Sequence, residues 1–152
     1  MEDSLFPALR QAQKTAMAET LRKTNRLSEK YGLSLSEAQI TGLIEARITS
    51  LVDTGRVETG EGILPKLIYA FCDSPYLFRD EYCQTLATLQ DLFYAFRNEL
   101  EDALADDELI LAMQRLYNGP GQGSLEYLEN ATVSDLYRAW QGEEEGDYED
   151  DD

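Results

Sequence analysis

No histidine occurs among the 152 residues of this sequence. Because histidine is the commonest general base near neutral pH and a frequent zinc ligand, its absence excludes Ser-His-Asp and Cys-His catalysis and zinc sites that contain imidazole. Only two cysteines are present, too few for a zinc site of four thiolates from one chain. We therefore expect no cofactor and no metal. We favour a protein that is not an enzyme, and a histidine-free enzyme is the alternative.

The two cysteines, Cys72 and Cys83, would form a disulfide only if the turn between them brought their helices together. In a reducing cytoplasm two small, half-buried thiols are favoured. A cytoplasmic location is expected because the first residues, MEDSLFPALRQ, have neither the basic nor the apolar region of a secretory signal. Long apolar runs are also missing. None approaches the roughly 20 residues that span a bilayer, so no membrane association is expected.

Positive charge is scarce and unevenly placed. The chain has 13 Lys and Arg against 30 Asp and Glu, a formal net charge of −17. Residues 1–32 hold six cations and four acids, residues 33–142 hold seven cations and 18 acids, and residues 143–152 hold eight acids and no cation. Such an acidic body repels phosphate backbones, which disfavours ordinary nucleic-acid binding. The tail, 143–152, has too little apolar content to fold and is predicted to be disordered.

The apolar spacing that is present predicts helices. A series of apolar residues recurs three or four positions apart, which is the pattern of one face of an α-helix. This series indicates a long helix over residues 80–104, about 37 Å in length at roughly 1.5 Å per residue. Before it, residues 63–72 carry one charged residue, which is typical of a helix buried near the centre of a fold. The series consists of Tyr82, Leu86, Leu89, Phe93, Phe96 and Leu100.

Further helices are predicted from terminal signals. A peripheral first helix, residues 5–31, ends at Gly32, and a second helix begins at the capping-box pattern Ser34-Leu-Ser-Glu37 and ends at Gly55. Two more helices begin at Asp106 and Thr132, and Ser124 caps a short turn between them. The apolar faces are expected to hold Leu5, Leu9, Ala12 and Ala16 in the first helix, Ile40, Leu43, Ile44, Ile48, Leu51 and Val52 in the second, and Val133, Leu136, Tyr137 and Trp140 in the last.

These patterns predict an all-α fold. We expect a single compact bundle of about six helices that forms one domain, residues 1–142, with the 63–72 helix near its centre and the 80–104 helix as its main support. A chain of 152 residues is long enough to bury such a core without disulfides or metals.

A polar loop follows the second helix and is the first half of a candidate interaction or anion site. Asp53, Arg56 and Glu58 cluster there. In a functional interpretation Arg56 clamps an anion or a carboxylate. In the structural interpretation, which we favour, it ties down the loop by binding helix-end carbonyls or Asp53. Gly60 and Gly62 are interpreted as turn residues and not as a phosphate cradle, because no Lys-Ser/Thr pair follows them.

The turn after the 63–72 helix is the second half of the candidate site. Exposed aromatic residues there would form a contact patch of the kind that anchors protein interfaces. Buried, they would close the end of the core, which is the favoured interpretation, and this applies to nearby Tyr82 as well. A deep pocket in which Arg56 or Asp73 met other polar groups would favour a small-molecule site. The residues singled out in this turn are Asp73, Tyr76, Phe78 and Arg79.

Three phrases of the sequence carry a resemblance: LVDTGRVETGEGILPKLIYAFCDSPYLFRDEYCQTL, DDELILAM and GQGSLEYL. They resemble an uncharacterised family of small bacterial proteins, a domain of unknown function, over roughly residues 33–137. The most specific parts are the 53–58 loop and the 71–75 turn. The family brings no known activity and no site residues, so the resemblance implies a bacterial cytoplasmic protein and no function.

Three functional hypotheses follow. The leading one is a non-catalytic helical module that binds another protein through its helix surfaces or through the 76–82 end. The alternative is a small-molecule-binding protein or a histidine-free enzyme that uses carboxylates and Arg56. The third is an acidic decoy that mimics nucleic acid. The basic part of the first helix, residues 22–30, is expected to meet the acidic body, the tail or an acidic partner rather than RNA or a membrane.

Overall fold

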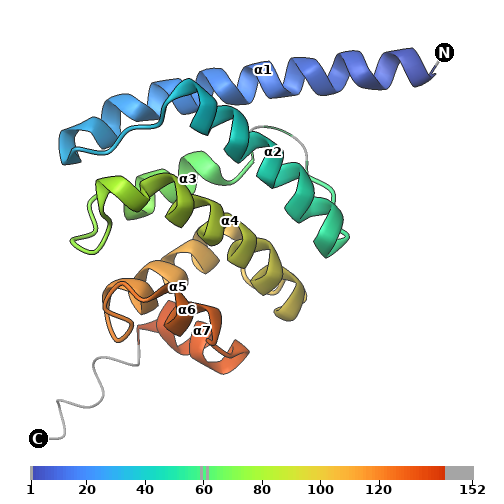
Figure 1. Ribbon diagram of the computed structural model, residues 1–152. Coiled ribbons are helices and arrows are strands. Elements are labelled where there is room, and N and C mark those ends of the chain that lie inside the picture. The colour runs from blue at the N-terminus through green and yellow to red at the C-terminus, as the bar shows by residue number, and fades with distance from the viewer. Residues whose placement is uncertain (1, 59, 61, 143–152) are drawn as a thin grey trace, which may run out of the picture.

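A computed structural model describes residues 2–58, 60 and 62–142 of the chain, with side chains described from residue 11 onward. Every regular element in these ranges is helical, and the predicted all-α class is confirmed. Figure 1 shows the arrangement. In chain order the elements are α1 (Glu2–Ser28), η1 (Glu29–Tyr31), α2 (Glu37–Thr54), α3 (Leu64–Phe71), η2 (Arg79–Glu81), α4 (Tyr82–Glu99), α5 (Asp106–Asn118), α6 (Leu125–Glu129) and α7 (Val133–Gln141).

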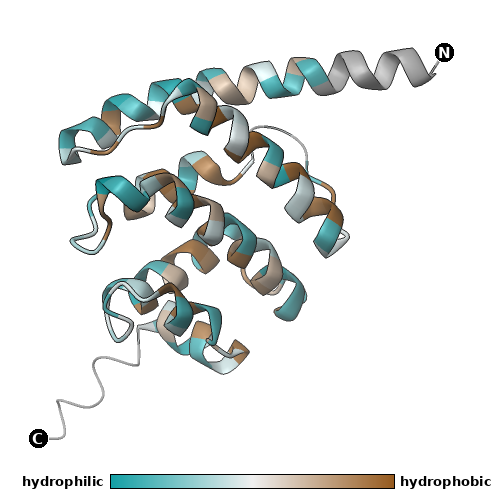
Figure 2. Cartoon of the chain, viewed as in Figure 1, coloured by the Kyte–Doolittle hydropathy of each residue, from teal (hydrophilic) through white to brown (hydrophobic). Residues whose placement is uncertain are grey.

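The helices stack from one end of the molecule to the other. α1 and α2 lie together at one end, α3 and α4 form the middle, and α5, α6 and α7 gather at the opposite end (Figure 1). The middle layer joins the two ends, because α3 contacts α1 and α5, while α4 contacts α2 and α6. Hydrophobic residues concentrate where the helices face one another (Figure 2).

The helix predicted over residues 63–72 is found as α3. Leu67, Ile68 and Phe71 are almost wholly buried, and the helix lies between α1 and α5. Its outer side is open, since Tyr69 is 71% exposed. The apolar composition therefore has two causes: one face of α3 fills the core, and the other lines a surface groove.

The long helix predicted over residues 80–104 is shorter at both ends. α4 begins at Tyr82 and spans 18 residues, about 27 Å at 1.5 Å per residue. It ends because Glu101 and Asp102 take left-handed φ values of 54° and 59°, and their N–H groups bond back to the last turn of the helix in the manner of a Schellman cap. Leu100 and Leu104 are both buried beyond this end, so the apolar spacing continues where the helix does not.

The start of the second helix also differs from the prediction. The capping box is formed by Ser36 and Gln39 and not by Ser34 with Glu37. Leu35 is buried, and its backbone N–H and carbonyl both bond to the side chain of Asn25 in α1. This contact keeps the chain extended past Ser34 and delays the helix by two positions.

Three predicted apolar faces need correction. Val133 in α7 is 36% exposed. Val52 in α2 is 73% exposed. Ala12 and Ala16 of α1 are also exposed, and the buried residues of this helix are Met17 and Leu21 further along it. The other members of the predicted first stripe, at positions 5 and 9, have side chains outside the described residues, as does the whole 143–152 tail.

The remaining terminal signals are found as predicted. Gly32 and Gly55 adopt left-handed conformations at the ends of their helices. Ser124 caps α6 through the N–H of Tyr127, and Thr132 caps α7 in a capping box with Asp135. These signals involve residues only three or four positions apart, which is why the sequence reveals them.

Candidate functional site

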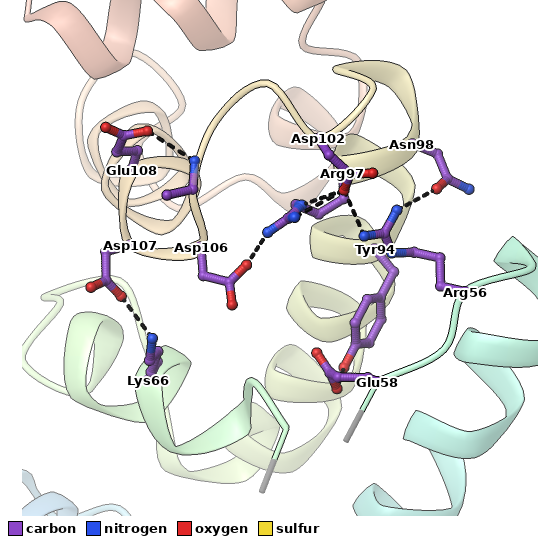
Figure 3. Close-up of polar contacts among 11 residues, drawn as sticks. Arg56, Glu58, Lys66, Tyr94, Arg97, Asn98, Asp102, Asp106, Asp107 and Glu108 are labelled. Atoms are coloured by element: carbon purple, nitrogen blue, oxygen red, sulfur yellow. Dashed lines mark hydrogen bonds and ion pairs between the residues drawn. The ribbon is translucent and has the colours of Figure 1, made fainter. Parts of the chain in front are cut away.

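The loop after α2 is held by a buried charged cluster. Arg47, in the middle of α2, is buried and directs its guanidinium to Glu58 in the loop. Arg47 Nε donates a hydrogen bond of 2.8 Å to Glu58 Oε1, and Arg47 Nη2 lies 2.8 Å from the same oxygen. The hydroxyl of Tyr94 in α4 donates to this oxygen over 2.5 Å (Figure 3). One carboxylate oxygen therefore joins α2, α4 and the loop.

Burial of Tyr94 reinforces this arrangement. Desolvation raises the pKa of the Tyr94 hydroxyl, and its hydrogen bond to Glu58 raises that pKa further. The hydroxyl therefore stays protonated and keeps its role as a donor. A carboxylate that accepts hydrogen bonds from a guanidinium and a hydroxyl makes stronger contacts than neutral pairs would.

Gly62 has no side chain, and Arg47 of this cluster occupies the space that a side chain at position 62 would fill. The φ of Gly62 is +83°, and a Cβ at this position would lie 2.7 Å from Arg47 Nε. A larger residue would push the guanidinium away from Glu58, in addition to straining a backbone that favours glycine. The sequence identifies Gly62 as a turn residue, and the structure gives it this second role.

Arg56 anchors the first part of the same loop to residues at the end of α4. Its Nη1 donates to Asn98 Oδ1 over 2.7 Å and its Nη2 to Asp102 Oδ1 over 2.6 Å (Figure 3). Arg97 donates to the same oxygen of Asp102 over 2.9 Å. These hydrogen bonds, from Arg56 first and Arg97 second, lower the pKa of Asp102 below its usual 3.8. Side chains at the end of α4 thus take the place of the partners expected for Arg56, which were helix-end carbonyls or Asp53.

Asp53 lies apart from the residues with which the sequence groups it. It is exposed and lines a depression with Ser50 and Asp91, whose side chains are hydrogen-bonded to each other. Arg56 and Glu58, in contrast, line a common groove. The structure therefore brings together two of the three residues proposed around this loop.

That groove, which we call the α1–α2 groove, lies between α1, α2 and the 56–58 loop and has a volume of about 380 Å³. Its walls are mostly aliphatic, and charged side chains stand at its floor and rim. The lining residues are Gln13, Lys14 and Met17 from α1, Ile44, Arg47, Ile48, Leu51 and Val52 from α2, and Arg56, Val57 and Glu58 from the loop.

The aromatic residues around the turn after α3 are not all buried, so the favoured interpretation, in which they close the end of the core, is wrong for Phe78. Tyr76 is half-buried and meets the ring of Tyr117 edge-on, with centroids 6.4 Å apart. Phe78 is 60% exposed, and Asp73 and Arg79 beside it are exposed as well. Neither Asp73 nor Arg79 is among the residues that line the described grooves.

Tyr82 lies inside the core. Its hydroxyl is buried and makes no hydrogen bond of good geometry among the described residues, although the Ser28 side chain beside it lowers its pKa. Burial is the larger influence and raises that pKa to about 12. The thiols of Cys72 and Cys83 are both free. Cys83 is half-buried as predicted, whereas Cys72 is fully buried, and desolvation raises the pKa of both thiols. In the described ranges no three Cys, Asp or Glu side chains gather closely enough to hold a metal ion.

A second groove, which we call the α3–α5 groove, lies between these two helices and has a volume of about 520 Å³. Its lining is predominantly apolar, and the exposed ring of Tyr69 is part of it. Lys66 and Asp107 form an ion pair of 3.1 Å at its edge (Figure 3). The lining residues are Pro65, Lys66, Tyr69 and Ala70 from α3, and Asp107, Ile110, Leu111 and Gln114 from α5.

Arg47 and Tyr94, the two partners of Glu58, are not predicted from the sequence. Arg47 carries a usable signal, because it falls at a helical spacing from the buried residues Ile40, Leu43 and Ile44. A charge in the middle of an apolar stripe needs a buried partner. Tyr94 has no such signal, since it follows Phe93 in an aromatic run that packing alone explains.

The described helices include none that is both long enough and apolar enough to cross a bilayer. No curated protein and no solved structure matches the chain. One family model does match, over residues 20–146. The match includes the loop after α2, the whole α3–α5 groove and the α2 and loop residues of the α1–α2 groove, but not the α1 residues that line the latter. It extends the 33–137 resemblance in both directions. The chain belongs to this family, described as "Family of unknown function (DUF6323)".

Proposed function

We propose that the protein is a non-catalytic interaction module of the cytoplasm, and that its α3–α5 groove receives apolar side chains from a helix of a partner protein. The observation that carries this proposal is the groove itself. It is open and apolar, and a tyrosine that is 71% exposed stands in its lining. Exposed aromatic side chains beside an apolar groove are frequent anchors of protein interfaces.

The polar groups of this groove favour a protein over a small molecule. Gln114 Nε2 donates to the carbonyl of Ala70 over 2.6 Å, and Lys66 is paired with Asp107. Small-molecule sites orient their ligands with a few convergent polar groups, and here Gln114, Lys66 and Asp107 are already engaged within the protein. Apolar side chains spaced along one face of a partner helix need no such groups.

Charge favours a basic partner. Asp107 lines the groove, and Asp106 and Glu108 are its neighbours in the first turn of α5. The whole chain has a net charge of −17. A partner helix with Lys or Arg flanking its apolar anchors would be attracted to this surface and oriented on it. The free thiols support a cytoplasmic setting, because reducing compartments keep cysteines unpaired.

The test places a photo-crosslinking phenylalanine analogue at position 69 of the full-length protein in cells. We expect a discrete adduct with another protein, and a synthetic helix from the crosslinked segment should bind the purified protein. Tyr69→Glu should abolish that binding while leaving the fold intact, because the side chain is exposed.

The matched control puts the same analogue at position 78, because Phe78 is also exposed but does not line the groove. The proposal requires that the adduct depend on position 69. Absence of an adduct there, identical adducts from both positions, or a crosslinked segment that binds Tyr69→Glu as well as wild type would contradict it.

A further inference from the structure

We propose that the α1–α2 groove is a binding site for a small aliphatic carboxylate, such as a medium-chain fatty acid. This site is separate from the protein-docking surface on α3 and α5, and neither proposal depends on the other. Its volume of about 380 Å³ falls in the range of about 300–1,000 Å³ that small-molecule pockets occupy.

The groove is a local exception to the charge of the chain. Three of the four charged side chains that line it are cationic: Lys14, Arg47 and Arg56 stand against Glu58. The chain as a whole carries −17. Arg47 is paired with Glu58 and Arg56 with Asp102, so the excess positive charge of the groove is that of Lys14. An anion repelled by the rest of the surface is attracted to this excess.

Arg47 supplies a buried donor at the floor. Its side chain is 6% exposed, and its Nη1 lies 3.2 Å from the sulfur of Met17. A thioether is a weak acceptor, so Nη1 has a poor partner, whereas Nε and Nη2 are bound to Glu58. A carboxylate that approached Nη1 would replace the sulfur with a charged oxygen and form a much stronger hydrogen bond.

The side chains of the groove walls favour a ligand with an aliphatic body. Ile44, Ile48 and Leu51 of α2 form an aliphatic surface, and Val52 and Val57 continue it to the exterior, where both are exposed. An aliphatic chain would cover these side chains and remove them from water, a gain that scales with the apolar area buried. The combination of a cationic floor and aliphatic walls matches a molecule with one anionic end and an apolar body.

The carboxylate of Glu58 limits the charge of the ligand. It lies within the same groove and is bound to Arg47. A doubly charged phosphate would be repelled by it more strongly than a carboxylate with a single charge. A single-charged headgroup is therefore favoured over phosphate.

The experiment titrates the full-length, isotope-labelled protein with decanoate, kept below the concentration at which it forms micelles, and follows backbone amide resonances by NMR. We expect saturable shifts at residues of α1, α2 and the 56–58 loop. Decanol and decyltrimethylammonium test the anionic end, and vesicles of anionic phospholipid test whether a membrane surface is the true ligand.

Two exposed or half-buried positions allow variants that keep the fold. Lys14→Gln should weaken decanoate binding about fivefold, the effect of one partly exposed ion pair. Val52→Glu, which adds a like charge at the rim, should weaken it by more than that. The matched controls are Lys66→Gln and Val133→Glu, which make the same changes of charge on α3 and α7 and should leave the affinity unchanged.

Several results would overturn the proposal. They are the absence of saturable shifts, shifts confined to the α3–α5 groove, equal binding of decanol, and binding to vesicles without binding to free decanoate. Equal losses in the groove variants and in their controls would show a general effect of net charge and would also overturn it.

Discussion

The two grooves are built alike and differ in where they hold their charges. Each lies between two helices with apolar walls and contains one ion pair. In the α3–α5 groove the side chains of Lys66 and Asp107 are 51% and 80% exposed. In the α1–α2 groove those of Arg47 and Glu58 are 6% and 21% exposed. The first pair is solvated and replaceable, whereas the second determines the path of a loop.

The physical reason is the cost of removing charge from water. An exposed pair gains little because water screens it, and its contribution is typically under about 1 kcal/mol. A buried pair must be complete, because removal of one partner leaves the other charge without solvent or counter-ion. The α3–α5 surface can therefore vary in its charges, while the floor of the α1–α2 groove cannot.

The largest expected effect comes from Arg47→Met, which keeps an unbranched stem but shortens the side chain and removes its charge. Glu58 would lose its cationic partner, and the free energy of unfolding should fall by about 3–5 kcal/mol. Urea denaturation measures this value. The matched variant Lys66→Ala should cost under about 1 kcal/mol, and similar losses from both variants would remove the distinction between the two grooves.

Gly62→Ala comes next. The added Cβ would meet Arg47 Nε at 2.7 Å in a backbone with φ of +83°, and we expect a loss of about 3 kcal/mol from crowding and strain together. Gly55 has a similar φ of +69°, and a Cβ added there would have no neighbour within 4 Å. Gly55→Ala should therefore cost only the strain, about 1 kcal/mol. Equal costs in thermal or urea unfolding would show that Arg47 is not crowded by position 62.

A pair of tyrosines tests whether hydrogen bonding, and not burial alone, holds the polar cluster. Tyr94→Phe removes a hydroxyl bound to a carboxylate and should destabilise the protein by about 2 kcal/mol. Tyr82→Phe removes a buried hydroxyl that lies beside Ser28 and makes no hydrogen bond of good geometry among the described residues. It should leave the stability unchanged or raise it by up to about 1 kcal/mol. The urea midpoints of unfolding show whether each variant is more or less stable than wild type. A loss of stability in both variants would contradict the expected difference between the two tyrosines.

The smallest expected effect is on the stability of the protein at low pH. The folded-state pKa of Asp102 lies below 3.8, so its contacts with Arg56 and Arg97 stabilise the protein above that pH and are lost as the pH falls through the folded-state pKa. The stability difference between wild type and Asp102→Asn should therefore be constant near neutral pH and shrink below about 3.8. A difference that persists to the lowest pH at which the protein stays folded would show that the carboxylate charge is not responsible.

Much of the fold can be predicted from the sequence because its signals are local. The caps at Ser124 and Thr132 and the glycines at positions 32 and 55 act over three or four residues. The end of α4 is different. Leu100 and Leu104 are buried as a helical stripe would bury them, yet the chain has already left the helix, so the apolar pattern alone gives the wrong end.

In the candidate site, the loop residues can be predicted from local sequence signals, but their partners cannot. Composition and spacing draw attention to Arg56 and Glu58, because both are charged residues in a short loop. Their partners lie far along the chain: Arg56 meets Asp102 across 46 positions, and Glu58 meets Tyr94 across 36. No local pattern records such contacts.

The sequence by itself determined the helical class, most helix ends, the acidic charge and the exclusion of histidine chemistry, because each depends on composition or on neighbours within one turn. The tertiary structure alone decided which face of each helix is open, which charges are buried and which residues line each groove. These properties depend on side chains brought together from separate helices. The open side of α3 and the buried Arg47 show this most clearly, since one is an apolar helix left partly in water and the other a charge placed within the core.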